Sequence, residues 1–299
     1  MSFLELNNVS KAFGDNKILD GLSFAVQEHS IFGFVGRNGA GKTTTMKMIL
    51  GLLAPDSGDI WVQGERVVFG QNQTNRYIGY LPDVPEFYDY MTPMEYLILC
   101  GKVTGMSAGD IRQRADELLQ MVGLGEVKKR IRGFSRGMKQ RLGIAQALMN
   151  RPKLLICDEP TSALDPVGRK EILDILRLVR GETTVLFSTH ILSDVERVCD
   201  EIAFLHQGNI VLSGSVDEVK RRRKAEGYEI DFISAGDAGR FAQAFPGGCV
   251  DGNLVRFSDK SDQDMLCAMH FLAENEIAVQ RMEMLEPTLE DLFLEVTRI

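Results

Sequence analysis

The fold is decided by the stretch Gly36-Arg37-Asn38-Gly39-Ala40-Gly41-Lys42-Thr43, which matches the pattern GxxxxGK[ST] completely. It follows the apolar run Ile31–Val35 and precedes a helical pattern that begins near Lys42. Glycines let the backbone wrap closely around phosphate oxygens, and the start of a helix attracts negative charge. A glycine-rich turn without a ligand is the competing interpretation, but the strand before it and the helix after it favour a phosphate site.

The side chains of this loop predict how a nucleotide would be held. Lys42 is expected against the β- and γ-phosphates, and Thr43 offers a hydroxyl to Mg²⁺. Thr44 is placed to reach the α-phosphate, and the glycines with Arg37, Asn38 and Ala40 supply backbone N–H groups. The sequence therefore predicts a nucleotide site that includes a divalent cation.

A second motif, Leu154-Leu155-Ile156-Cys157-Asp158-Glu159, is an apolar run that ends in two carboxylates. Because the carboxyl ends of parallel strands share one edge of a sheet, we expect it near the phosphate loop. Asp158 is expected in the Mg²⁺ shell, and Glu159 as the base that orients and deprotonates the attacking water. Taken alone, such a run is equally well explained as a strand that ends in surface acids. In a chain that also contains a phosphate loop, the functional interpretation is favoured.

Apolar runs alternate with helical patterns in the first part of the chain. Ile31–Val35, Leu154–Cys157 and Val185–Phe187 are each followed by turn residues and helix periodicity, which is typical of a parallel sheet covered on both faces. We predict an α/β domain over residues 1–220 and a small C-terminal α+β domain over 221–299. A helical subdomain is expected at about 85–150, with helices at Met94–Val103, Ala108–Val122 and Gly137–Met149. The C-terminal pattern predicts alternating strands and helices at Tyr228–Ile233, Ala238–Phe245, Asn253–Phe257, Gln263–Glu274, Ile277–Met284 and Leu289–Val296.

The segments around these two motifs resemble those of ATP-binding cassette (ABC) ATPases. One stretch is similar to the family signature LSGGQ: Phe134-Ser135-Arg136-Gly137-Met138-Lys139-Gln140-Arg141, in which Ser135 and Gly137 match but Phe134, Arg136 and Met138 do not. The family's D-loop is similar to Pro160-Thr161-Ser162-Ala163-Leu164-Asp165, and its switch-histidine loop to Ser188-Thr189-His190. Phe13 stands where the family places an aromatic that stacks on adenine. The resemblance covers residues 1 to about 220, with five motifs in the family's order.

The resemblance implies a P-loop NTPase (ABC ATPase) core that binds and hydrolyses ATP with Mg²⁺. It also implies a second ATP-binding subunit, in a homodimer or a heterodimer. In such a dimer Ser135, Gly137 and Asp165 of one subunit approach ATP held by the phosphate loop of the other. His190 is an implied contact of the γ-phosphate, although a lone histidine after a strand is more often structural.

Two departures from the family's usual motifs make the sequence resemble a narrower subgroup. Its members are the ATP-binding subunits of prokaryotic exporters whose permease is a separate chain. Asp83 stands where the family's Q-loop has glutamine, and its carboxylate could reach Mg²⁺ or its water. The signature is also looser than usual, and the tail Glu286–Leu294 resembles that of the subgroup. The subgroup implies a transmembrane permease as partner. The segment Val84–Leu99 is a candidate docking surface for it, although ordinary core packing explains most of that segment.

Composition limits the class of protein and its location. The chain has 299 residues, 44% hydrophobic and 25% charged, with a net charge of −8, which predicts repulsion from nucleic acid. Basic runs at 128–132 and 220–224 are interpreted as solvated surface. No run approaches the roughly 18 to 20 apolar residues of a membrane span, and the N-terminus has no signal pattern. Five scattered cysteines indicate neither a disulfide framework nor a zinc site. We expect a cytoplasmic protein attached to the membrane through its permease, with no nucleic-acid partner.

Two other functions stay open on the sequence. A non-transport ABC ATPase acting on ribosomes or DNA generally has two cassettes, a long coiled coil or a basic surface, and this sequence has none of them. A module that binds nucleotide without hydrolysing it is disfavoured by the intact set Lys42, Asp158, Glu159 and His190. No motif points to a particular transported substrate.

Overall fold

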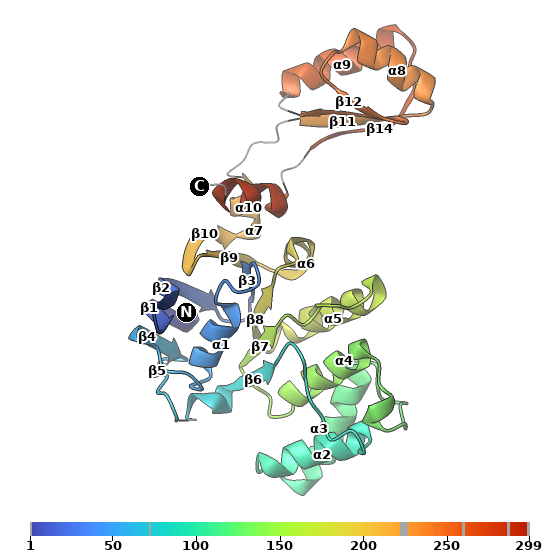
Figure 1. Ribbon diagram of the computed structural model, residues 1–299. Helices are drawn as coiled ribbons and strands as arrows, with labels where there is room; N and C mark the ends of the chain where they lie inside the picture. The colour runs from blue at the N-terminus through green and yellow to red at the C-terminus, as the bar shows by residue number, and fades with distance from the viewer. Residues whose placement is uncertain (1, 72, 222–226, 259–260, 286–287, 298–299) are drawn as a thin grey trace. The chain divides into compact units, whose positions relative to one another are not determined.

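The computed structural model describes residues 2–71, 73–221, 227–258, 261–285 and 288–297 of the chain. They form two compact units, Met1–Val216 and Asp217–Ile299, which are described separately (Figure 1). The division falls at the start of helix α7 (Val216–Arg221). Residues 222–224 of the basic run, and residues 286–287 of the tail, lie outside the described residues.

A six-stranded sheet forms the centre of the first unit, in the order β10-β9-β3-β8-β7-β6. The five strands from β9 to β6 are parallel, and β10 pairs antiparallel with β9. Strands β3, β7 and β8 are buried along their whole length, as their apolar runs predict. These three predicted strands are therefore confirmed. The bounds are β3 (Ile31–Gly36), β6 (Ile78–Leu81), β7 (Leu154–Asp158), β8 (Thr184–Thr189), β9 (Glu201–His206) and β10 (Asn209–Ser215).

An N-terminal antiparallel sheet is the main element that the sequence reasoning missed. It has the order β2-β1-β4-β5 and consists of β1 (Ser2–Phe13), β2 (Asn16–Gln27), β4 (Ser57–Val62) and β5 (Glu65–Arg66). The pairing of β1 with β2 changes register several times, for example between Leu6 and Val9. The apolar residues of β1 therefore do not keep the period of two that identifies a strand.

One hydrophobic core joins the two sheets and the helix α1 (Lys42–Ile49). It contains Leu4, Leu6 and Leu22 of the antiparallel sheet, Met46 and Ile49 of α1, and Phe34, Ile156 and Leu186 of the six-stranded sheet. Because α1 lies within this core, the loop before it is held firmly at the carboxyl end of β3.

Helices replace strands between β6 and β7. They are α2 (Pro93–Val103), α3 (Ala108–Met121) and α4 (Arg136–Ala147), with the short turns η1 (Thr74–Tyr77) and η2 (Ile131–Gly133) nearby. Each α-helix begins after a hydroxyl N-cap, Thr92, Ser107 or Ser135, which accepts a backbone N–H of the first turn. Figure 1 shows the three helices grouped beyond the β6 edge of the sheet. The three predicted helices are confirmed, and α5 (Pro166–Val179) and α6 (Leu192–Val198) complete the helices of this unit.

The second unit contains a four-stranded antiparallel sheet in the order β12-β13-β11-β14. Alternate residues of its strands, including Tyr228, Ile230 and Phe257, pack with Phe241 of α8 and Leu272 of α9. Both helices therefore cover the same face of this sheet. The bounds are β11 (Gly227–Phe232), α8 (Ala235–Ala244), β12 (Cys249–Asp251), β13 (Leu254–Ser258), α9 (Asp262–Glu274), β14 (Val279–Met284) and α10 (Leu289–Thr297).

Candidate active site

The glycine-rich loop turns sharply between β3 and α1. Gly39 and Gly41 have φ values of +81° and +110°, which residues with a Cβ rarely adopt. A Cβ at Gly36 would lie 2.7 Å from the Leu205 carbonyl oxygen, so this position also excludes a side chain. Gly41 precedes α1 and no described side chain caps the helix. The first N–H groups of α1 are therefore free to bind an anion.

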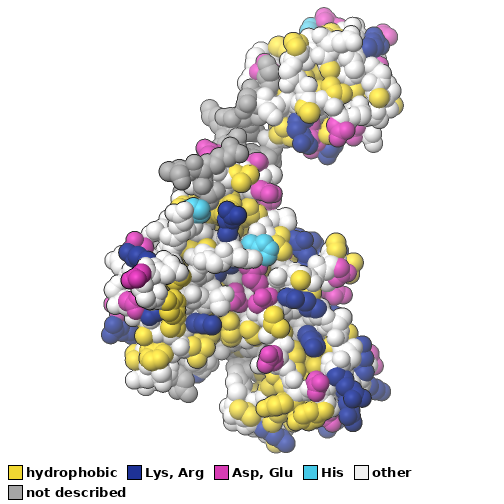
Figure 2. All heavy atoms as spheres, viewed as in Figure 1, with side chains coloured by type: hydrophobic (Ala, Val, Ile, Leu, Met, Phe, Trp, Pro, Cys, Tyr) yellow, Lys and Arg dark blue, Asp and Glu magenta, His cyan; other side chains and the backbone are white. Residues whose placement is uncertain are grey.

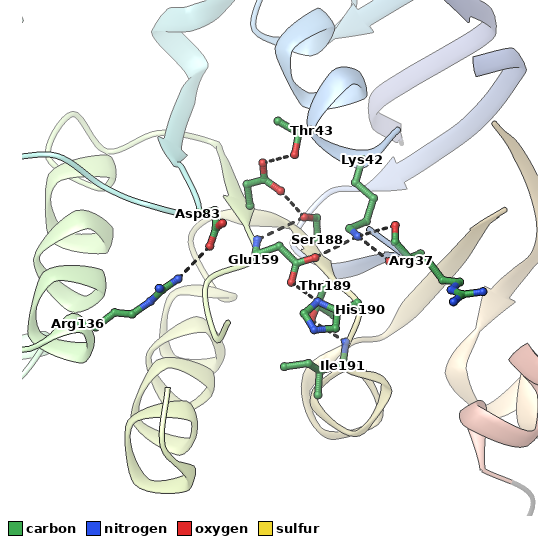
Figure 3. Close-up of polar contacts among 12 residues, drawn as sticks. Arg37, Lys42, Thr43, Asp83, Arg136, Glu159, Ser188, Thr189, His190 and Ile191 are labelled. Carbon is green, nitrogen blue, oxygen red and sulfur yellow. Dashed lines mark hydrogen bonds and ion pairs between the residues drawn. The ribbon is translucent and has the colours of Figure 1, made fainter. Parts of the chain in front are cut away.

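Lys42 is buried at the start of α1. Its Nζ donates to the Gly36 carbonyl oxygen at 2.6 Å and to that of Arg37 at 3.3 Å. The same ammonium lies 3.0 Å from Glu159 Oε1 (Figure 3). A lysine held in this way presents a fixed positive charge beside the loop.

Asp158 accepts hydrogen bonds on both carboxylate oxygens. Thr43 Oγ1 donates to Oδ2 at 2.7 Å, and Ser188 Oγ donates to Oδ1 at 2.7 Å. The sequence reasoning noted Ser188 only as part of the Ser188-Thr189-His190 segment. The signal that could have identified it is a polar residue near the end of a buried strand, because Ser188 is the residue of β8 directly opposite Asp158 of β7.

Glu159 follows Asp158 in a left-handed backbone conformation, with φ of +49°. Such conformations are uncommon outside glycine and cluster at functional sites. The Glu159 N–H donates to the Ser188 carbonyl oxygen at 3.0 Å. In the side chain, Oε2 lies 2.8 Å from His190 Nδ1, and Oε1 lies 3.0 Å from Lys42 Nζ. Glu159 thus contacts His190 with one oxygen and Lys42 with the other.

These groups line one cavity of about 450 Å³. The structure brings together most of the predicted site residues there, namely Phe13, Asn38, Gly39, Gly41, Lys42, Thr43, Thr44, Asp83, Asp158, Glu159 and His190. Gly36, Arg37 and Ala40 belong to the same loop without lining the cavity. Ile18 and Ser162 also line it, although the sequence reasoning gave them no role. Ser162 lies within the segment similar to the D-loop, whereas nothing in the sequence singles out Ile18.

Three predicted residues, Ser135, Gly137 and Asp165, are not among those that line this cavity. Ser135 caps α4 by accepting the Met138 N–H, and Asp165 caps α5 by accepting the Gly168 N–H. Both capping bonds measure 3.3 Å. Within the single chain, these two side chains therefore act as helix caps.

Asp83 lines the cavity just after the end of β6, and Oδ1 is 3.3 Å from Arg136 Nη2 of α4 (Figure 3). Burial raises the pKa of Asp83 above its ordinary value, and the charges of Asp158 and Glu159 add to this shift, whereas the Arg136 guanidinium and His190 oppose it without reversing it. The Arg136 cation therefore favours the ionised form of this carboxylate.

This chain is similar in sequence to proteins of a known family. A family model described as ABC transporter matches residues 19–162. The uncharacterised ABC transporter ATP-binding protein YxlF of Bacillus subtilis is 43% identical over 228 residues, which cover 76% of each chain. The linearmycin resistance ATP-binding protein LnrL of Bacillus subtilis is 35% identical over 306 residues, covering 98% of each.

Solved structures give the same assignment. The structure of an ATP-binding subunit of an ABC transporter, 33% identical in sequence, superposes with a TM-score of 0.67 over 74% of this chain and 93% of that one. The predicted P-loop NTPase fold is confirmed by this match, and the family resemblance is confirmed by the sequence relatives. The chain therefore belongs to the ATP-binding subunits of ABC transporters, and it is an ATPase that couples ATP hydrolysis to transport.

Proposed function

We propose that this chain powers an exporter whose permease is a separate polypeptide, and that it hydrolyses MgATP at the cavity between the glycine-rich loop and Glu159. The observation that carries this proposal is the placement of Glu159, which contacts Lys42 with one oxygen and His190 with the other at the cavity wall. Outward transport is supported by relatives named for linearmycin and daunorubicin resistance.

Glu159 acts as the general base in this proposal. Its carboxylate takes a proton from the water that attacks the γ-phosphorus, while the bond to the β,γ-bridging oxygen breaks and ADP leaves. When ATP binds, the Lys42 ammonium leaves Glu159 and contacts the β- and γ-phosphates instead. The Glu159 carboxylate is then free to bind the water. His190, at hydrogen-bond distance from Glu159, orients that carboxylate and contacts the γ-phosphate.

Thr43 and Asp158 are the residues that would hold Mg²⁺. Their hydroxyl and carboxylate oxygens meet at 2.7 Å, and oxygen atoms are the ligands that Mg²⁺ prefers. Bound there, the cation would neutralise charge on the phosphates. Asp83 contacts Arg136 through Oδ1, and its other carboxylate oxygen could join this shell or its water. Phe13, half exposed on the same cavity, is the proposed adenine platform.

A second ATP-binding subunit, most simply another copy of this chain, completes the site in our proposal. Ser135 and Gly137 lie at the start of α4, where free N–H groups and a helix dipole suit a phosphate. Since these residues and Asp165 do not line their own chain's cavity, they are available to the nucleotide held by the partner.

A groove beside the helical region is the proposed docking surface of the permease. It has a volume of about 510 Å³ and is lined by residues of β6, of α2 and of the end of α4, and by residues of the segments before α2 and after α4. The lining includes Tyr88, Tyr96, Leu99, Val103 and Met149. Tyr96 is buried, but Tyr88 and Val103 are exposed, with Val103 78% accessible. Figure 2 shows hydrophobic side chains gathered over the region of α2. Exposed apolar surface of this kind favours contact with another protein.

None of the described helices is long and apolar enough to cross a membrane. We infer that the chain reaches the cytoplasmic face of the membrane through this groove. A candidate permease gene is sought next to the gene for this chain. The two proteins are then co-expressed for the test of docking.

The test compares Val103→Asp with a control variant, Val167→Asp. The control places the same charge on α5, at a valine that is 66% exposed. Val103→Asp is expected to abolish co-purification of the permease and its stimulation of ATPase activity, because a buried unpaired carboxylate opposes docking. Val167→Asp is expected to retain both. Equal retention by the two variants would exclude this groove as the docking surface.

A further inference from the structure

The nucleotide cavity contains more negative charge than its proposed ligand favours. Asp83, Asp158 and Glu159 all line it, and among the described lining residues only Lys42 carries a permanent positive charge. Figure 2 shows acidic side chains gathered near the centre of this face of the first unit. The triphosphate of ATP is a polyanion, so an uncompensated third carboxylate opposes its binding.

Arg136, the first residue of α4, supplies a compensating cation from outside the cavity. Its Nη2 lies 3.3 Å from Asp83 Oδ1 (Figure 3). The two side chains are 44% and 47% accessible, so solvent weakens the pair without removing it.

Further contacts hold Asp83 against the same helix. Gln140 is fully buried, and its Nε2 donates to the Asp83 carbonyl oxygen at 2.7 Å. A Cβ at Gly143 would lie 2.5 Å from Leu81 Cδ1, so α4 approaches the end of β6 very closely. Arg136, Gln140 and Gly143 share one helical face, since they are spaced at i, i+4 and i+7. The backbone of Asp83 is thereby fixed at the cavity. The negative charge of its carboxylate therefore needs a cation close to that position.

We propose that Arg136 is a charge-compensating residue for nucleotide binding, which neutralises Asp83 so that the cavity accepts a polyphosphate. This inference rests on the proposed function of the cavity as the MgATP site. It concerns a different pair of residues from those that contact the phosphates or the attacking water.

The test measures the affinity of the full-length chain for a fluorescent ATP analogue in EDTA at low ionic strength. Without Mg²⁺, any role of Asp83 as a metal ligand makes no contribution. Arg136→Gln is expected to lower affinity about two- to fivefold, the size expected of a partly exposed ion pair. Adding Asp83→Asn to Arg136→Gln is expected to restore affinity, because no carboxylate then needs compensation. The loss shrinks at high salt, since screening weakens the repulsion.

Two controls separate charge compensation from folding and from net charge. Arg136→Lys keeps the positive charge and is expected to retain most of the affinity. Arg132→Gln removes an exposed arginine that does not pair with Asp83, and it is expected to leave affinity unchanged. Thermal melts check that each variant is folded.

A loss in Arg136→Gln that persists undiminished after Asp83→Asn is added overturns the proposal, because Arg136 then does not act through the charge of Asp83. No loss in Arg136→Gln overturns it as well. If the unaltered chain binds the analogue no better than Lys42→Ala, the proposed nucleotide site itself fails. The two failures are therefore distinguishable.

Discussion

Replacing Glu159 with glutamine separates the binding of ATP from its hydrolysis. Glutamine has nearly the same shape and keeps an oxygen that accepts hydrogen bonds, but it cannot take a proton from water. We expect nucleotide binding to persist and turnover to fall at least about 100-fold, the lower end of a general base's contribution. ATP then remains bound, and we expect a stable dimer in which ATP is trapped between the two subunits.

The same substitution has a second consequence that follows from the contact with Lys42. The side chains of Lys42 and Glu159 are 6% and 12% accessible and lie 3.0 Å apart. Breaking a fully buried ion pair costs roughly 3–5 kcal/mol. Lys42 keeps the Gly36 carbonyl oxygen at 2.6 Å, and glutamine keeps a neutral acceptor. The expected cost is therefore smaller, about 1–2 kcal/mol.

This cost corresponds to a fall in Tm of about 2–8 °C for a unit of this size in the absence of nucleotide. Bound MgATP is expected to reverse the fall, because its phosphates replace the missing carboxylate as the partner of Lys42. A protein destabilised without nucleotide but stabilised with it is the specific signature of the Lys42–Glu159 contact.

The assays are phosphate release under single-turnover conditions, binding of a fluorescent ATP analogue, and thermal melts with and without MgATP. Glu182→Gln is the matched control, since Glu182 is exposed and precedes the start of β8, whereas the cavity residue His190 follows the end of that strand. Undiminished turnover in Glu159→Gln would refute Glu159 as the base. A Tm that MgATP does not restore would refute the exchange of partners by Lys42.

Two further predictions concern the loop and the strand beside the helical region. Lys42→Ala is expected to weaken ATP binding by at least about tenfold, because a charged hydrogen bond contributes roughly 1.5–3 kcal/mol; unchanged affinity in a direct binding titration would contradict the phosphate-loop interpretation. Gly79→Ala is expected to destabilise the first unit by about 1–3 kcal/mol, because the new Cβ would lie 2.2 Å from the Ala147 carbonyl oxygen. Denaturant unfolding measures this change. Gly109→Ala is the control, since a Cβ at Gly109 meets nothing within 4 Å. Equal stability of the two variants would argue against the close approach at Gly79.

The elements that the sequence predicted correctly are those whose signal is contiguous. The loop Gly36–Thr43 contains its own glycines, helix start and lysine, and the strand Leu154–Cys157 is apolar at every position. β1 was missed because its register shifts break the alternation of apolar residues. Ser135 and Asp165 have a local role as helix caps in the single chain, so their part in a dimer stays a prediction.

By itself, the sequence determined the family, the phosphate loop and the paired carboxylates, because each depends on residues that are neighbours along the chain. Only the tertiary structure decided which distant side chains meet. Ser188 reaches Asp158 across 30 positions, and Arg136 reaches Asp83 across 53. The physical reason is that contact between such residues depends on how β6, β7, β8 and α4 pack, and packing is set by the whole core rather than by local pattern. The glycine-rich loop Gly36–Thr43 was therefore readable from the sequence at once, whereas the pairing of Asp83 with Arg136 was not.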